Sequence, residues 1–183
     1  KLSIADIPGQ AQLVSIMGAS GCGKSQMLKV IAGLSKFNEG TVKVYGEPVS
    51  SNHSFPMVFQ TYSNFEWYTV LENVMIPMTC RGISKEEARN RALELLDCVG
   101  LKDHVDKYPS NLSGGQQQRV AIARCLACNS KIILFDEATG ALDIKMKREV
   151  QNIMLKIFYD TSLDDPTIIN VSHSIEEVAY ISN

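Results

Sequence analysis

Residues 13–25 of the chain read LVSIMGASGCGKS. The first five form a short apolar run, and the last eight match the pattern G-x-x-x-x-G-K-[ST] at every specified position. After this loop, apolar residues recur at helical spacing from Met27 to Leu34, and the helix is expected to end near Gly33. Strand, loop and helix follow in the order of a phosphate-binding loop, and they predict an α/β fold with a mainly parallel sheet.

The residue types of this loop fit the chemistry of phosphate binding. Glycines let consecutive backbone N–H groups point at phosphate oxygens, and the helix N-terminus adds its dipole. The Lys24 ammonium is expected to reach the β- and γ-phosphates, where it counts as a catalytic group, and the Ser25 hydroxyl to ligate Mg²⁺. The predicted nucleotide-binding residues here are Gly18, Ala19, Ser20, Gly21, Cys22, Gly23, Lys24, Ser25 and Gln26. The Cys22 thiol is either a reactive group beside Lys24 or a small inert filler.

A second apolar run ends in two carboxylates. Residues 131–137 read KIILFDE, the pattern of a strand buried on both faces whose functional residues emerge at its carboxyl end. Asp136 is expected to hold Mg²⁺, directly or through water, and Glu137 to orient and deprotonate an attacking water. The alternative, a buried strand with a solvated acidic end, loses weight because a phosphate-binding loop precedes it.

Residues 112–119 read LSGGQQQR and combine a helix start with two glycines. Ser113 is a good N-cap, and apolar residues at helical spacing predict a helix that continues to Ala127. Each glycine disfavours a helix by about 1 kcal/mol relative to alanine, so something other than helix stability explains the pair. A close approach of bare backbone N–H groups to an anion is one explanation, and an ordinary glycine-rich turn is the other.

Composition restricts the function classes. The chain has 183 residues, 45% hydrophobic and 21% charged, with a net charge of −2, which predicts one globular domain and no nucleic-acid partner. No apolar run approaches the roughly 18 residues of a membrane span, and the N-terminal residues lack a signal-peptide layout, so a membrane role is expected to require a partner. The five cysteines are odd in number, which favours a reducing compartment, and the pair Cys125 and Cys128 is interpreted as two small buried residues.

Together these motifs resemble the nucleotide-binding domain of ATP-binding cassette (ABC) transporters, over nearly all 183 residues. The resemblance implies one ABC-type ATPase domain over residues 1–183: a P-loop NTPase core with a mainly parallel sheet, a small antiparallel β part and an inserted α-helical subdomain at approximately 61–128. Both ends are expected to be shorter than in the family. The cofactors that the resemblance implies are ATP and Mg²⁺.

The same resemblance assigns roles outside the phosphate-binding loop. Gln60 matches the family's glutamine that contacts Mg²⁺, and His173 matches the histidine that contacts the γ-phosphate. Asp143 belongs to the segment that contacts the nucleotide across the dimer. In the signature stretch, Ser113, Gly114, Gly115 and Gln116 are implied to bind the nucleotide of a neighbouring subunit. His53 and His104 have no match and are interpreted as surface or satisfied core residues.

Several positions depart from the family pattern. Gln26 stands where threonine is usual, Ala138-Thr139-Gly140 replaces proline-threonine-serine, and Ser174 replaces an aspartate. None of these removes a catalytic group. The aromatic residue that stacks on adenine has no evident counterpart, so base stacking is the implied function with least support.

Within the expected helical subdomain, Ser84 to Glu87 forms a capping-box pattern that predicts a helix to about Cys98. Phe65, Trp67 and Tyr68 form an aromatic cluster after Gln60. This cluster is either part of a docking surface for membrane subunits, as the family implies, or packing inside the helical subdomain.

The function implied by the resemblance is ATP hydrolysis that drives solute transport, with dimer closure as the power stroke. The expected partners are a second nucleotide-binding domain (an identical chain or a paralogue), transmembrane permease subunits and, as a further candidate, a substrate-binding protein. The expected location is peripheral, at the cytoplasmic face of a membrane. Sequence details divide between nitrate, taurine and sulfonate importers and lipoprotein-release or macrolide-export ATPases, with a slight preference for the importers.

Two other functions fit the sequence less well. A soluble ABC ATPase of DNA repair or translation would carry a long coiled-coil insertion or tandem cassettes, and the interval between Gln60 and Ser113 has room for neither. A nucleotide-binding regulatory module without turnover is expected to lack the base, whereas Glu137 and His173 are present.

Overall fold

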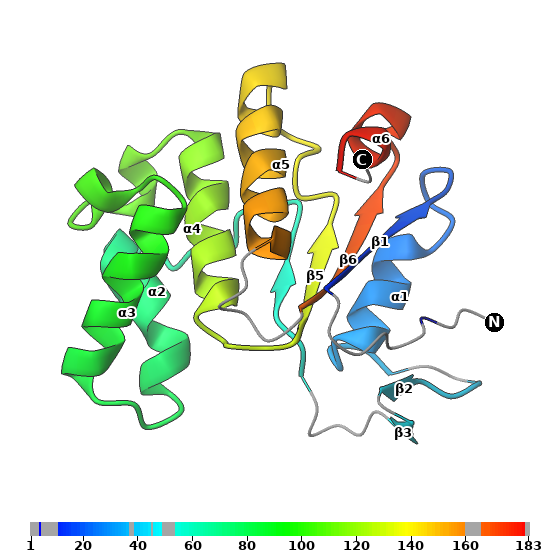
Figure 1. Cartoon of the computed structure of the whole chain (residues 1–183), viewed down its shortest axis with the longest axis horizontal. Coiled ribbons are helices and arrows are strands. Elements are labelled where there is room, and N and C mark those ends of the chain that lie inside the picture. Colours follow the sequence, from blue (N-terminus) through cyan, green and yellow to red (C-terminus); the bar gives the residue numbers. More distant parts are fainter. Residues whose placement is uncertain are drawn as a thin grey trace.

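A four-stranded parallel sheet forms the centre of the chain (Figure 1). In the computed structural model, which describes residues 4, 11–36, 39–44, 46–48, 54–159 and 166–181, the strand order is β1-β6-β5-β4. The strands are β1 (Gln12–Met17), β4 (Met57–Val58), β5 (Ile132–Asp136) and β6 (Thr167–Ser172). The predicted mainly parallel sheet is confirmed.

Parallel register brings the carboxyl ends of these strands to one edge of the sheet. Met17 pairs with Ser172, and Asp136 pairs with Val171. On the other side of β5, Val58 pairs with Phe135. Ligands of open α/β sheets bind at such an edge, so the loops that follow all four strands can contribute to one site.

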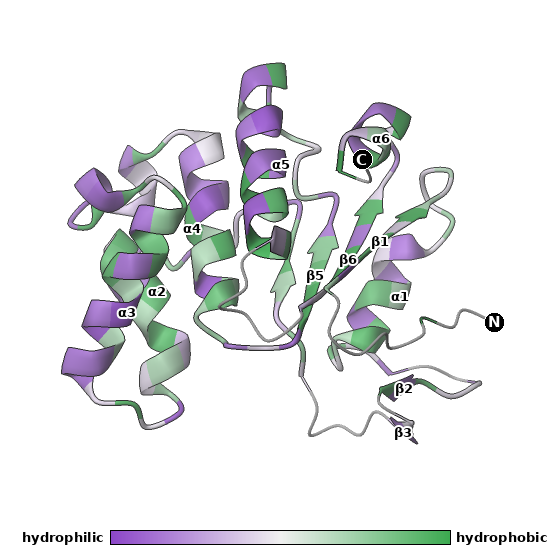
Figure 2. Cartoon of the chain, in the orientation of Figure 1, coloured by the Kyte–Doolittle hydropathy of each residue, from purple (hydrophilic) through white to green (hydrophobic). Residues whose placement is uncertain are grey.

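Strand β5 is buried on both faces, as its apolar run predicted. Alternate residues of a strand point to opposite faces, and here Ile133 and Phe135 join one core cluster while Ile132 and Leu134 join another. The first cluster includes side chains of the helices on the left of the sheet in Figure 1, and the second includes Leu28 of the helix on the right. Figure 2 shows β5 as mainly hydrophobic, whereas the helix farthest from the sheet, over residues 85–98, is largely hydrophilic.

Six α-helices lie within the described residues. They are α1 (Lys24–Ile31), α2 (Val70–Thr79), α3 (Lys85–Cys98), α4 (Gly114–Leu126), α5 (Ile144–Tyr159) and α6 (Ile175–Ile181). Short 3-10 turns at Lys102–His104 and Pro109–Asn111 connect α3 to α4. Within the described residues, no helix is both long and apolar enough to cross a bilayer.

Helices α2, α3 and α4 follow β4 and precede β5 in the chain, and they pack against one another beside the sheet. They lie within the stretch predicted to be a helical subdomain. Their N-termini are capped by side chains. The Ser84 hydroxyl accepts from the Glu87 N–H, as the sequence predicts. The reciprocal bonds of a full capping box form instead at Thr69–Glu72 and Ser113–Gln116.

The predicted antiparallel part is also present. It consists of β2 (Lys43–Val44) and β3 (Glu47–Pro48), which lie beside α1 in Figure 1. His53 lies outside the described residues.

Candidate nucleotide-binding site

The phosphate-binding loop joins β1 to α1. Gly23 occupies the N-cap of α1 at φ 94°, a left-handed conformation that a residue with a side chain rarely adopts. The Lys24 side chain is buried, and its Nζ donates to the carbonyl oxygens of Gly18 and Ala19, each at 2.8 Å. The ammonium is therefore held within the loop, next to the helix N-terminus that favours an anion.

Two of the three groups predicted to hold Mg²⁺ lie side by side. The Ser25 Oγ donates to Asp136 Oδ1 at 2.7 Å, although 111 positions separate them in the chain. A hydroxyl and a carboxylate at this spacing are hard oxygen ligands, which suit Mg²⁺ completed by water and phosphate oxygens. The donor set therefore fits the metal that the sequence predicts.

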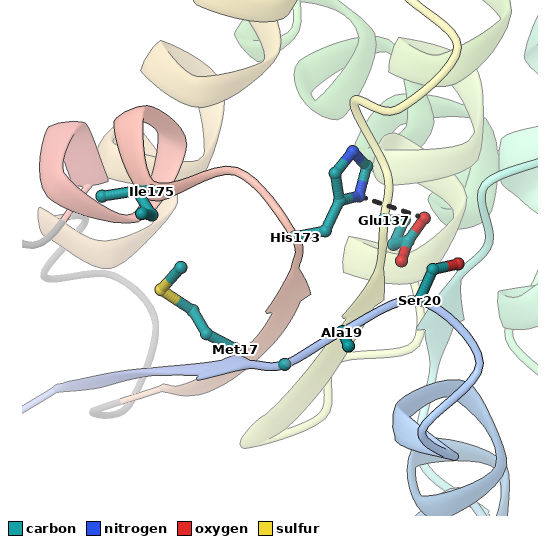
Figure 3. A pocket seen from close by; sticks show the side chains of 7 residues that line it. Met17, Ala19, Ser20, Glu137, His173 and Ile175 are labelled. Carbon is teal, nitrogen blue, oxygen red and sulfur yellow. Dashed lines mark ion pairs between the residues drawn. The ribbon is translucent and has the colours of Figure 1, made fainter.

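Glu137 and His173 lie across a pocket of about 630 Å³ from the start of the phosphate-binding loop (Figure 3). The His173 Nδ1 is 3.5 Å from Glu137 Oε2. Met17 and Ile175 lie on the side of the pocket away from Glu137. The sequence-predicted base and histidine are thus brought together beside the loop that would hold the phosphates.

The backbone of Glu137 is strained. Its φ of 47° lies in the left-handed region, which costs a non-glycine residue roughly 1–2 kcal/mol. The conformation is held by a bond from the Glu137 N–H to the Val171 carbonyl and by one from the Gly140 N–H to the Glu137 carbonyl. The Glu137 carboxylate that follows β5 lies beside the His173 ring (Figure 3).

Gln60 follows β4 at the same sheet edge. Its amide packs against Gly140, where an added Cβ would come within 3.2 Å of Gln60 Nε2. Among the described residues, no hydrogen bond joins Gln60 to Ser25 or Asp136. The preceding residue is tied to the signature helix, because buried Gln118 donates to the Phe59 carbonyl at 3.2 Å.

The signature stretch forms the start of α4. The Ser113 hydroxyl accepts from the Gln116 N–H, and Gln116 Oε1 accepts from the Ser113 N–H at 3.0 Å. Because Oε1 is committed to that bond, Gln116 Nε2 donates to His104 Nε2, 3.0 Å away. His104 is therefore a half-buried support of Gln116, a role that its sequence context did not indicate.

The two signature glycines are also required by packing within the chain. A Cβ on Gly114 would collide with the Tyr62 hydroxyl, and one on Gly115 would lie 2.9 Å from the Met146 Cγ. An anion contact and a glycine-rich turn are the two explanations that the sequence itself offers. Close approach of Tyr62 and of α5 is an additional reason for glycine at these positions. The N–H groups of Gly114 and Gly115 lie in the first turn of α4, where the helix offers them no acceptor.

Asp143 caps α5 in the structure. Its Oδ1 accepts from the Met146 N–H at 2.9 Å, and its carbonyl accepts from the Lys147 N–H. Among the described residues, Asp143 makes no side-chain bond to the phosphate-binding loop. Its predicted contact with nucleotide remains a prediction.

The cysteines differ in environment. Cys22 is exposed, with its Sγ 4.0 Å from Lys24 Nζ. Cys125 is buried, and desolvation raises the pKa of its thiol to about 12. Burial also raises the pKa of Cys128, against the opposing charges of Arg81 and Arg124. Both thiols of the pair are therefore poor sources of thiolate at neutral pH.

Comparison with known proteins agrees with this geometry. The chain matches the model of the ABC transporter family over residues 8–140. It is 44% identical to the glutamine transport ATP-binding protein of Escherichia coli, over 91% of this chain and 71% of that protein. It is 41% identical to the nitrate import ATP-binding protein of a Synechocystis species, over 93% of this chain and 64% of that protein.

A solved structure is similar over most of the chain. It is the dimeric post-hydrolysis state of an ATP-binding cassette bound to ADP and Pi, with a TM-score of 0.79 and 37% sequence identity. The similarity covers 93% of this chain and 78% of that one. The fold predicted from the sequence is thereby confirmed.

The left-handed backbone at Glu137 gives a stability prediction. The free energy of unfolding of Glu137→Gly should be about 1 kcal/mol higher than that of Glu137→Ala, because glycine relieves the strain at positive φ. Urea denaturation followed by circular dichroism measures the difference. The matched control is Glu94, an exposed residue inside α3, where Gly should instead be about 1 kcal/mol less stable than Ala. The same order of stability at both positions would contradict a strained Glu137.

Proposed function

The chain belongs to the ABC transporter family, and from this premise we propose that it is an ATP-hydrolysing subunit that drives solute import through ATP-dependent pairing of two such domains. The observation that carries the proposal is the convergence of Lys24, Ser25, Asp136, Glu137 and His173 at one edge of the sheet. This set contains a phosphate-binding group, oxygen ligands for a metal ion and a base, and these are the groups that phosphoryl transfer to water requires.

Each residue has a distinct role in the proposed reaction. Backbone N–H groups of the loop and the Lys24 ammonium bind the β- and γ-phosphates. Ser25 and Asp136 hold Mg²⁺, with Gln60 as a further candidate ligand, and the bound ion would neutralise charge on the phosphates. Glu137 accepts the proton of the attacking water, and His173, 3.5 Å away, contacts the γ-phosphate.

The signature residues are assigned to the nucleotide of a partner subunit. The signature residues form the start of α4, and the phosphate-binding loop leads into α1. These two helices lie on opposite sides of the sheet in Figure 1. The Ser113 hydroxyl and the N–H groups of Gly114 and Gly115 stand at a helix N-terminus, an arrangement suited to an anion. In a head-to-tail pair with a second copy or a paralogue, these residues would lie at the γ-phosphate of the nucleotide that the partner's phosphate-binding loop holds.

The direct test of hydrolysis uses Glu137→Gln, which keeps the size of the side chain and removes the base. We expect kcat to fall by a factor of 100 or more, because a general base contributes about 10²–10⁴ to the rate. The variant should also accumulate as an ATP-bound dimer in Mg-ATP by light scattering. Glu94→Gln, on the exposed face of α3, is the matched control and should retain wild-type turnover. Full activity in Glu137→Gln would refute the role of Glu137 as the base.

Transport requires permease subunits, and the aromatic cluster is the proposed docking surface. Phe65 packs beneath the Arg124 guanidinium, 5.1 Å from it, whereas the Trp67 residue is 70% exposed and Tyr68 is also exposed. Buried Asn73 fixes the cluster, since it accepts from the Phe65 N–H and donates to the carbonyls of Phe65, Tyr68 and Thr69. A large apolar side chain held outward by a rigid turn fits a protein partner.

The proposed assembly places the chain at the cytoplasmic face of a membrane, bound to permease subunits and served by a substrate-binding protein. Its similarity to a nitrate import ATP-binding protein supports the importer assignment. If the chain were instead a soluble ABC ATPase, it would function without any membrane partner. If it were a regulatory module without turnover, it would function without Glu137.

Substitution of Trp67 tests the docking surface. Trp67→Ala should reduce co-purification with the permease at least tenfold, because buried interface tryptophans contribute about 2 kcal/mol or more. ATPase activity of the isolated chain should be unchanged. Tyr159→Ala, which removes an exposed aromatic ring at the end of α5, is the control and should keep the complex intact. Loss of binding in the Tyr159 variant but not in the Trp67 variant would move the docking surface to α5.

A further inference from the structure

A buried carboxylate joins two catalytic segments of the chain. Glu177 of α6 is only 7% exposed, and its Oε2 accepts from the Thr139 Oγ1 at 2.8 Å and from the Ser172 Oγ at 2.9 Å. Its other oxygen, Oε1, is buried and has no hydrogen-bond partner. Neither the reaction nor the assembly proposed above uses Glu177.

The two hydroxyls belong to different parts of the site. Thr139 lies two residues after Glu137, in the turn that continues to Asp143, and the Leu142 N–H donates to its carbonyl. Ser172 ends β6 and directly precedes His173. A single carboxylate oxygen therefore ties the segment that carries the base to the segment that carries the histidine.

The histidine segment is fixed by further bonds around Glu177. The Ser174 N–H donates to the Ser172 Oγ at 3.0 Å, and the Glu177 N–H donates to the Ser174 Oγ at 3.3 Å. His173 thus lies between two serines that are both bonded within this group. A shift of Thr139 would act on Glu177, then on Ser172, and so on the backbone that directs His173.

Stability alone does not account for this group. An unpaired buried polar atom costs about 1–3 kcal/mol, and among the described residues no cation forms an ion pair with Glu177. An apolar side chain would fill the same space without that cost. Buried polar groups with this cost are expected where geometry at a site requires them.

We propose that Glu177 is a positioning residue that makes the Glu137–Asp143 segment and His173 move as one unit. The proposal rests on the proposed ATPase function, because its consequence is a concerted alignment of base and histidine. When Asp143 meets the partner subunit, the Thr139–Glu177–Ser172 link transmits its displacement to His173. Contact with the partner and alignment of the histidine are thereby coupled within one chain.

The test removes each hydroxyl separately and then both together, with Thr139→Val and Ser172→Ala. Each single change should lower kcat about tenfold and leave the ATP KM within about twofold of wild type, since neither hydroxyl contacts nucleotide. The double variant should have a kcat no lower than that of the slower single variant, because either change already breaks the link through Glu177. Thr139→Ser, which restores a hydroxyl, should recover most of kcat.

Thr79→Val is the matched control, since the Thr79 hydroxyl is also hydrogen-bonded but only within α2, and this variant should keep wild-type kcat. Additive losses in the double variant, or a wild-type kcat in Thr139→Val, would overturn the proposal. So would a Thr139→Ser variant as slow as Thr139→Val.

Hydrogen–deuterium exchange separates this proposal from the ATPase assignment, because it needs no turnover. Thr139→Val should speed amide exchange in residues 172–174, and Ser172→Ala should speed it in residues 138–142. Exchange confined to the mutated segment would overturn the link even in an active enzyme. Reciprocal exchange changes in a chain without ATPase activity would support the link and refute the proposed function instead.

Discussion

The site depends on the parallel, in-register pairing of β1, β6 and β5. Three strands from distant parts of the chain end at one level, so Gly18, Asp136 and His173 emerge within reach of one another. The 2.7 Å bond between Ser25 and Asp136 is the direct consequence, since it joins residues that local sequence cannot relate. A slip of β5 by one residue would exchange its two buried faces and turn Asp136 away from the phosphate-binding loop.

Patterns with a local cause could be predicted from the sequence. The phosphate-binding loop was recognisable because glycine, lysine and serine at that spacing have a phosphate chemistry of their own. The buried β5 and the helix after Ser113 follow from apolar periodicity and capping preferences, which act over a few residues. The expectation that Asp136 and Ser25 meet required only that Asp136 ends one strand of a parallel sheet and that Ser25 follows another.

Features that depend on contacts between distant segments could not be predicted in this way. The left-handed φ of Glu137 is held by the Val171 carbonyl, and nothing in the sequence around Glu137 marks it. The packing requirement for the glycine pair is likewise absent from the local sequence, because the close approach of Tyr62 to Gly114 exists only once α4 is packed. Likewise, His104 beside Gln116 and Glu177 between Thr139 and Ser172 are products of tertiary structure.

The proposed active site is shared between two chains, and mixing two inactive variants tests this most directly. Lys24→Ala disables the phosphate-binding loop, and Ser113→Asp keeps the N-cap but directs a carboxylate at the anion. Each variant alone should lack ATPase activity. In a mixed dimer, the intact loop of one chain faces the intact signature of the other, so mixing should restore activity that neither variant has. A mixture as inactive as its components would show that loop and signature act within one chain, contrary to the account.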